Sequence, residues 1–302
     1  MRSRALSSDA ILLLTAAIWG FAFAAQRIGM EHIGPFLYTS LRFALGAIVL
    51  SPMWRKNAKT FPSVPVRRTL KVGSFAGIFL FLGVTFQQVG IIYTTAGKAG
   101  FITGFYVVLV PILGLFFHRR AHSGGWIGAI LAVAGLYFLS VLGIASGGSS
   151  GVAGVNRGDL FVSASALFWA GHVIVLDRYA KYVPFIPFAI TQYVFCAGLS
   201  GVVAIFTEPI AINQIIDAAI PIAYGGAVSV GVAYTLQIVG QRNAPPTHAS
   251  IIMSLEGVFA AIGGLIILGE RLSAIELVGC ALMLCGMLVS QLTLGRRAIR
   301  EN

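Results

Sequence analysis

The sequence predicts an all-α membrane protein with ten transmembrane helices, arranged as two inverted five-helix repeats. Hydrophobic residues make up 57% of the 302 residues and charged residues only 10%, whereas soluble domains carry about 25% charged residues. Apolar runs of about twenty residues, long enough to cross the hydrocarbon core of a bilayer, recur along the chain. The two halves also match at a nearly constant offset, which predicts an internal duplication.

Charged residues, prolines and glycines divide the chain into ten apolar segments. We expect spans at Asp9–Met30, Pro35–Trp54, Leu70–Tyr93, Ala96–His118, Gly124–Gly143, Arg157–Ala180, Phe185–Thr207, Ile215–Arg242, Pro245–Leu268 and Leu272–Leu294. The first segment resembles a signal peptide, but its apolar run continues to Ile28 and the duplication needs it as a partner. We therefore expect it to be retained as the first span.

The two predicted repeats cover residues 1–144 and 157–302, and residues 145–156 form a flexible linker rich in glycine and serine. An offset of 150 pairs Trp19 with Trp169 and Gln87 with Gln237. Because each repeat has five spans, an odd number, the second repeat must enter the membrane in the opposite sense to the first.

The basic residues support this topology independently. Of the 21 Lys and Arg residues, sixteen fall in connections on the side of both termini, four fall on the other side, and Arg42 lies within a span. Basic connections stay in the cytoplasm. We therefore expect a multi-pass protein of a bacterial-type cytoplasmic membrane, with both termini cytoplasmic and the linker periplasmic. The net charge of +11 then reflects topology and does not indicate a nucleic-acid partner.

Glu256 lies in the middle of an apolar span that opens with Pro245 and Pro246. At about 1.5 Å per residue it lies about 15–17 Å below the start of that helix, near the bilayer midplane. A carboxyl group at this depth is costly and normally faces the protein interior or a wet cavity. It could bind a cation, a proton or the amino group of a substrate, or it could fix helix packing through a hydrogen bond.

Trp19 and Trp169 occupy equivalent places in the two repeats. Tryptophan usually lies at membrane interfaces, but both lie about ten residues into their spans and are surrounded by small residues. Each ring could pack two helices together or form the wall of a cavity. His172 lies one turn after Trp169 on the same face, and it is either a substrate contact or a neutral packing residue.

Gln87 and Gln237 form a second equivalent pair, and Tyr234 shares a helix face with Gln237. Amides inside a membrane can join helices or supply hydrogen bonds to a polar ligand. Gln88 is adjacent to Gln87 and must point elsewhere. At most one of these two neighbouring side chains therefore faces a cavity.

The connection near residue 95 is a candidate outer mouth. Tyr93 and Lys98 flank it, and Tyr106 follows in the next span as a further candidate contact for a ligand. Lys98 could attract a carboxylate or extend its ammonium group along the helix to the interface.

The equivalent connection in the second repeat is a candidate inner mouth. Asn243, Pro245, Pro246 and His248 mark it, and both mouths are candidate hinges. Arg42 lies about seven residues into its span, where a charge needs a partner that the sequence does not identify.

Three strings resemble the EamA repeat, one branch of the drug/metabolite transporter superfamily. They are A-A-I-W-G-F-A-F at 16–23, A-L-F-W-A at 166–170, and S-L-E-G-V-F-A-A-I-G-G-L-I-I-L-G-E-R-L at 254–272. The resemblance covers essentially the whole chain. It implies an exporter or permease of small organic metabolites, similar to amino-acid exporters of the YddG type.

Two positions depart from the family pattern. Gly257 stands where the family usually has proline after the glutamate. The first repeat has F-H-R-R at 117–120 where the family usually ends in G-E-x-L, so we expect Glu270, in the second repeat, to be structural.

Together these features predict a secondary transporter that binds a small molecule near the midplane and works by alternating access. We expect no cofactor and no metal, and a monomer or weak homodimer in the lipid bilayer. A flippase for a lipid or lipid precursor on the same fold is the alternative. An intramembrane enzyme is disfavoured because the deep spans offer Glu256 and His172 but contain no paired acids, no H-E-x-x-H motif and no G-x-S-x-G motif. A purely structural protein is disfavoured by the paired polar residues at mid-depth.

Overall fold

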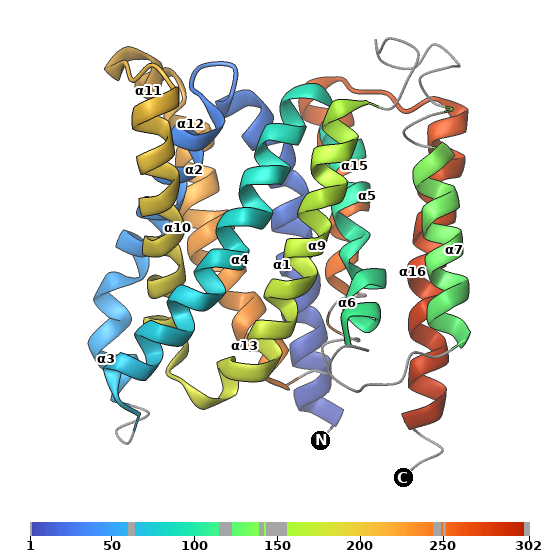
Figure 1. The fold of residues 1–302 in the computed structure, drawn as a ribbon, viewed down its shortest axis with the longest axis horizontal. Coiled ribbons are helices and arrows are strands. Elements are labelled where there is room, and N and C mark those ends of the chain that lie inside the picture. Colours follow the sequence, from blue (N-terminus) through green and yellow to red (C-terminus); the bar gives the residue numbers. More distant parts are fainter. Residues whose placement is uncertain are drawn as a thin grey trace.

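The computed structural model describes residues 2–59, 64–114, 123–138, 142, 156–243, 249 and 252–298. Within these ranges the chain is helical and contains no strand, which confirms the all-α class. The long helices lie side by side in one bundle, and the first turn of α1 and the last turn of α16 lie at the same end (Figure 1).

The helices follow the predicted spans in order. They are α1 (Arg2–Gly29), α2 (Pro35–Leu50), η1 (Ser51–Met53), α3 (Trp54–Ala58), α4 (Val66–Tyr93), α5 (Ala96–Gly104), α6 (Tyr106–Gly114), α7 (Ser123–Tyr137), α9 (Arg157–Tyr179), η4 (Ala180–Tyr182), α10 (Phe185–Thr207), α11 (Ile212–Asp217), α12 (Ala219–Ala223), η5 (Tyr224–Tyr234), α13 (Thr235–Asn243), α15 (Glu256–Leu268) and α16 (Ala274–Ala298).

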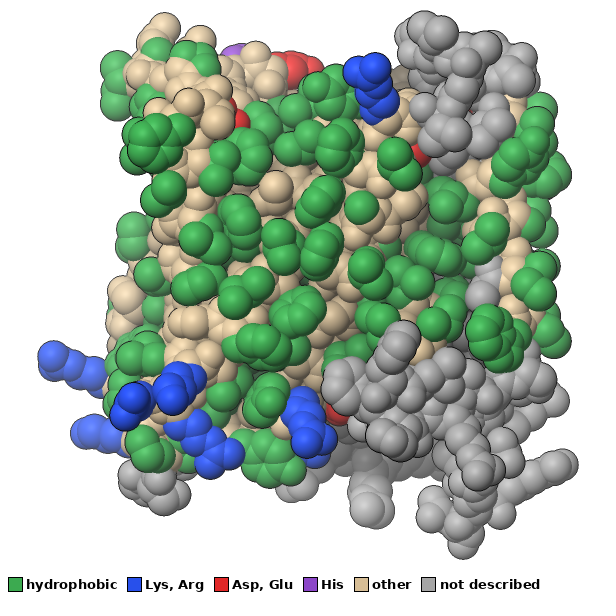
Figure 2. Space-filling model, in the orientation of Figure 1, with side chains coloured by type: hydrophobic (Ala, Val, Ile, Leu, Met, Phe, Trp, Pro, Cys, Tyr) green, Lys and Arg blue, Asp and Glu red, His purple; other side chains and the backbone are tan. Residues whose placement is uncertain are grey.

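Six helical segments among the described residues are long and apolar enough to cross a membrane. They are Ser8–Gly29, Pro35–Asn57, Val66–Tyr93, Arg157–Tyr182, Phe185–Thr207 and Ala219–Arg242. Four shorter apolar helices accompany them, at Ala96–Val110, Trp126–Tyr137, Ile252–Leu268 and Ala274–Gly286. Hydrophobic side chains cover the face seen in Figure 2, and Lys and Arg gather at the edge where α3 and the start of α4 lie.

Local chemistry explains where the helices begin. Pro35 is the first residue of α2, a position where proline loses no hydrogen bond. Thr95 accepts a hydrogen bond from the Lys98 N–H at the start of α5, and Asn156 accepts one from the Gly158 N–H at the start of α9. These side chains satisfy backbone donors that a helix start leaves free.

Two glutamates that lie just after the ends of α10 and α15 also cap the starts of α2 and α5. The Glu208 carboxylate accepts from the N–H groups of Phe36 and Leu37 at 2.8 and 2.7 Å. The Glu270 carboxylate accepts from the N–H groups of Ala96 and Gly97 at 2.9 and 3.1 Å. A carboxylate at a helix start also interacts favourably with the helix dipole. Glu270 therefore has the structural role predicted for it.

The helix predicted at Ala96–His118 is not continuous. Its described part, residues 96–114, consists of α5 and α6, separated at Phe105. The span predicted at Pro245–Leu268 is likewise interrupted, because α15 begins at Glu256 after a turn at Leu255. The two interruptions differ by an offset of 150 residues. The second occurs without the proline that the family usually has, since Gly257 stands there.

Close packing explains the glycine at 257. The helices α5 and α15 cross so closely that a Cβ on Gly257 would lie 3.0 Å from the Cα of Phe101. A Cβ on Gly100, in the opposite helix, would lie 2.3 Å from the Cβ of Ala260. This crossing brings Glu256 against the centre of the bundle.

The span predicted at Ile215–Arg242 is not one regular helix. It contains α11, α12, a π-helix (η5) and α13. In a π-helix the backbone bonds run from residue i to i+5, so residues five apart share a face. Tyr224, Ser229 and Tyr234 are spaced in this way and all face the centre or the neighbouring α1.

Equivalent contacts recur in the two halves. A Cβ on Gly90 would lie 2.6 Å from a methyl of Val162, and a Cβ on Gly240 would lie 2.7 Å from a methyl of Leu12. Gly240 lies 150 residues after Gly90, and Val162 lies 150 residues after Leu12. The same contact therefore occurs twice, with the roles of the two halves exchanged. The helices α7 and α16 lie side by side (Figure 1) and show the same exchange. A Cβ on Gly135 would lie 2.6 Å from the carbonyl oxygen of Gly279, and a Cβ on Gly286 would lie 2.6 Å from that of Gly128.

Candidate functional site

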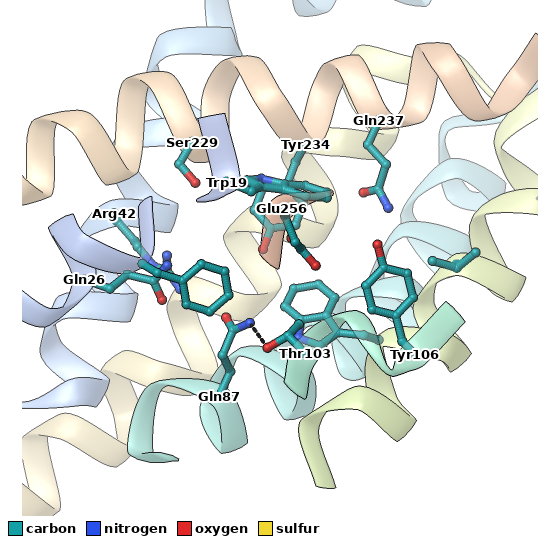
Figure 3. A pocket seen from close by; sticks show the side chains of 13 residues that line it. Trp19, Gln26, Arg42, Gln87, Thr103, Tyr106, Ser229, Tyr234, Gln237 and Glu256 are labelled. Atoms are coloured by element: carbon teal, nitrogen blue, oxygen red, sulfur yellow. Dashed lines mark hydrogen bonds between the residues drawn. The ribbon is translucent and has the colours of Figure 1, made fainter. Parts of the chain in front are cut away.

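A small central cavity lies where helices from both halves meet. Its volume is about 30 Å³, which is room for about two water molecules. The residues that line it are Trp19, Phe23, Gln26, Arg42, Gln87, Thr103, Tyr106, Trp169, Val173, Ser229, Tyr234, Gln237 and Glu256. They belong to nine helical segments, namely α1, α2, α4, α5, α6, α9, η5, α13 and α15, and Figure 3 shows their side chains converging on the cavity.

Tyr234 is the centre of the aromatic wall. Its ring lies 4.6 Å from Trp19 and 6.0 Å from Trp169, measured between ring centroids. Phe43 and Tyr193 lie behind it at 5.8 and 6.2 Å. The equivalent tryptophans of the two halves therefore meet on one tyrosine, where they pack helices together and also line the cavity.

Six buried polar atoms on the cavity-lining residues have no hydrogen-bond partner among the described residues. They are Trp19 Nε1, Gln26 Oε1, Arg42 Nε, Tyr106 Oη, Trp169 Nε1 and Gln237 Oε1. Each unsatisfied buried group costs about 1–3 kcal/mol. A bound polar molecule or water in the cavity would recover that free energy, so the cavity favours a ligand with several hydrogen-bonding groups.

The neighbouring glutamines of α4 point in different directions. Gln87 lines the cavity and donates to the hydroxyl of Thr103 at 3.0 Å. Gln88 turns away, accepts from Arg42 Nη2 at 3.2 Å and donates to the sulfur of Met30 at 3.0 Å. One of the two faces the cavity, as their adjacency requires.

Arg42 is therefore a cavity residue whose neighbour the sequence did not reveal. Its guanidinium lies over the rings of Tyr38 and Phe43, at 5.5 and 5.2 Å from their centroids. Gln88 supplies a neutral oxygen. No described carboxylate forms an ion pair with this cation.

Glu256 is the first residue of α15 and is only 4% exposed. Its carboxyl group faces the cavity (Figure 3) and accepts no hydrogen bond from the described residues. The start of a helix stabilises negative charge. Tyr106, which is 150 residues earlier, begins α6 and lines the same cavity.

His172 lies outside the cavity lining. It is fully buried behind Trp169, with the two rings edge to face and 5.9 Å apart. Its Nε2 is 2.8 Å from Gln192 Oε1. In this conformation His172 supports the wall and does not reach the cavity.

Lys98 is not at an open mouth, where it could attract a ligand carboxylate, and its ammonium group does not extend to the membrane interface. Its side chain is 1% exposed, and its ammonium group lies 3.0 Å from the Glu276 carboxylate. A buried lysine needs such a partner because an unpaired charge is costly in a low-dielectric interior. Glu276 lies 178 residues away in the sequence, so spacing alone could not identify it.

The other residues predicted at the two mouths do not reach the cavity or are not described. Tyr93 is 56% exposed at the last turn of α4. Asn243 ends α13, and its side chain is outside the described part of the structure. Pro245, Pro246 and His248 also lie outside the described residues.

A second polar cluster lies at the end of the bundle opposite the termini. Arg27 donates to the carbonyl groups of Ile91, at 3.1 Å, and Thr94. The Thr94 hydroxyl donates to the buried Asp159 carboxylate at 2.5 Å. We call these residues, with Lys98 and Glu276, the outer polar layer. It joins α1, α4, α5, α9 and α16 at the end of the bundle opposite the termini (Figure 1).

Sequence reasoning missed several cavity residues, and some carried a detectable signal. Phe23 lies four residues after Trp19, and Gln26 lies seven residues after it, so the three share one helix face. Val173 follows Trp169 in the same way. Ser229 carried no such signal, because its spacing of five from Tyr234 is meaningful only in a π-helix.

Comparisons with known proteins agree with this architecture. The model of the EamA-like transporter family matches residues 6–141 and 156–291. An uncharacterized transporter of Archaeoglobus fulgidus is 32% identical over 289 residues, covering 95% of this chain and 86% of its own. The threonine/homoserine exporter RhtA of Escherichia coli is 27% identical over 300 residues, covering 95% and 92%. One crystal structure has the same fold, with a TM-score of 0.69, 21% identity, and 97% and 98% coverage.

Proposed function

We propose that this chain, which belongs to the EamA-like transporter family, exports a small amphipathic metabolite such as an amino acid across the cytoplasmic membrane. The observation that carries the proposal is the central cavity. Its aromatic wall suits an apolar side chain, and its unpaired polar atoms suit the polar ends of the same molecule. The similarity to exporters named for threonine and homoserine supports an amino acid rather than a lipid.

We further propose ten transmembrane helices in two inverted repeats, residues 1–144 and 157–302. The exchanged contacts of Gly90 with Val162 and of Gly240 with Leu12 support this arrangement, as do the paired interruptions at Phe105 and Leu255. Lys and Arg gather at the edge of the bundle where α3 and the start of α4 lie. That placement supports cytoplasmic termini.

Alternating access is the mechanism that the cavity supports best. A cavity of about 30 Å³ holds about two waters and is too small for an amino acid. The helices must therefore separate to admit a ligand. The outer polar layer closes the periplasmic end in the proposed orientation, so substrate from the cytoplasm would be released only after this layer opens.

The test is flux of labelled L-threonine, L-homoserine and other amino acids from proteoliposomes, with protein-free liposomes as control. We expect downhill efflux of some of these amino acids and competition among them. A fluorescent phospholipid in the same vesicles tests the flippase alternative. Lipid movement without amino-acid flux would overturn the proposal.

Glu256 determines whether this flux is coupled to protons. It is the only carboxyl group that the sequence places deep in a span, so we propose that it carries any coupled proton. If efflux responds to an imposed pH gradient, the Glu256→Gln variant should transport without that response. A gradient response that persists in the variant would exclude Glu256 as the coupling group.

A further inference from the structure

Arg42 is a buried cation that has no counterion in the part of the chain that the structure describes. It lies about 10 Å below the start of α2, which is well inside the hydrocarbon core, and it is 1% exposed. No described carboxylate pairs with it. Burying a charge in this way is strongly unfavourable, so its presence in the cavity wall needs an explanation.

The contacts of Arg42 hold the guanidinium in place but leave it unsaturated. A guanidinium has five N–H donors. The described residues supply one acceptor, Gln88 Oε1 at 3.2 Å, and two ring faces. The buried Nε has no partner among them. Gln88 is itself fixed by Met30, so the group is oriented before any ligand arrives.

Resting on the transport function proposed above, we infer that Arg42 is the carboxylate-binding residue of the cavity. A guanidinium binds a carboxylate through two parallel hydrogen bonds, and it does so better than any other side chain. The bound carboxylate would supply the missing counterion. Arg42 thus selects ligands that carry an anionic group and rejects their uncharged analogues.

Glu256 completes the site by offering the opposite charge. It enters the cavity from α15, whereas Arg42 enters from α2, and Figure 3 shows the two side chains apart from each other. They do not form an ion pair. A ligand between them could place its carboxylate on Arg42 and its ammonium group near Glu256. This arrangement identifies the substrate class as zwitterionic amino acids.

The competing explanation is that Arg42 only packs α2 against the π-helix. Its Cδ would lie 3.4 Å from a Cβ on Gly225, so removing the side chain would leave a gap there. The test must therefore distinguish an effect on ligand selection from an effect on folding. Changing the ligand does this, because it leaves the folded protein unaltered.

The experiment compares L-threonine with L-threoninol, in which a hydroxymethyl group replaces the carboxylate. Each competes for efflux of a labelled amino acid from proteoliposomes. In the wild type we expect threonine to compete at least about tenfold better, because charge-assisted bonds are about twice as strong as neutral ones. In Arg42→Gln the ratio should fall to about one, and Arg42→Lys should keep part of it.

Arg27→Gln is the matched control, because Arg27 contacts backbone carbonyls outside the cavity. It should keep the wild-type ratio even if flux is reduced. Equal competition by the two compounds in the wild type would overturn the role of Arg42 and leave the transport function standing. So would an unchanged ratio in a folded Arg42→Gln variant. Absence of flux for every amino acid would instead overturn the proposed function and this inference with it.

Discussion

The central cavity and the outer polar layer are both built from buried polar side chains, but these side chains are paired in the outer polar layer and largely unpaired in the cavity. In the outer layer each of the principal groups has a partner: Lys98 pairs with Glu276, and Thr94 bonds Asp159. In the cavity, Arg42 and Glu256 have no counterion among the described residues. Paired groups hold helices together, whereas unpaired ones are available to a ligand.

The largest expected effect follows from breaking the ion pair of the outer layer. Lys98→Met should lower the free energy of unfolding by about 3–5 kcal/mol, because it leaves the buried Glu276 carboxylate without its counterion and with only the Ser273 N–H as a donor among the described residues. Thermal unfolding in detergent measures the loss. The double variant Lys98→Met with Glu276→Leu should recover most of it. Additive losses in the double variant would show that the two charges do not depend on each other.

A smaller loss is expected at the Thr94 hydroxyl. Thr94→Val removes a hydrogen bond to a buried carboxylate, which contributes about 1.5–3 kcal/mol. Thr39→Val is the matched control, since the Thr39 hydroxyl is also buried but has no partner among the described residues. The control should be neutral or slightly stabilising. Similar melting temperatures for the two variants would remove the distinction between paired and unpaired hydroxyls.

The smallest effect on stability, with a clear effect on flux, is expected inside the cavity. Gln237→Leu removes an amide whose oxygen is unpaired, so we expect stability to change by less than about 1 kcal/mol. Amino-acid flux should fall about tenfold, because the bound substrate would lose one hydrogen bond between neutral groups. Gln241→Leu, one turn further along α13 and outside the cavity lining, should retain flux. Equal loss of flux in both would place the effect on α13 as a whole.

The helices were largely predictable because apolar length determines them. The span predicted at Phe185–Thr207 is α10 with the same bounds. The interruptions at Phe105 and Leu255 were not predictable, since the sequence stays apolar through both. They lie next to the close crossing of α5 and α15, two helices that are distant in the chain, and no local pattern reports such a crossing.

The cavity was partly predictable for a related reason. Trp19, Gln87, Tyr234, Gln237 and Glu256 stand out as polar or aromatic residues at mid-depth, and all of them line the cavity. The partners of Lys98 and Arg42 did not stand out, because each pairing joins helices that only the tertiary fold brings together.

The π-helix at Tyr224–Tyr234 has a consequence for how this chain tolerates change in length. Its repeat of five presents Tyr224 to the Ile18 carbonyl and Ser229 and Tyr234 to the cavity. Removing one residue would restore an ordinary α-helical repeat and turn these side chains to different faces. Substitutions in the segment alter one contact each, but a deletion misaligns all of them. In alignments of close relatives, gaps should therefore avoid these eleven residues even where their identities vary.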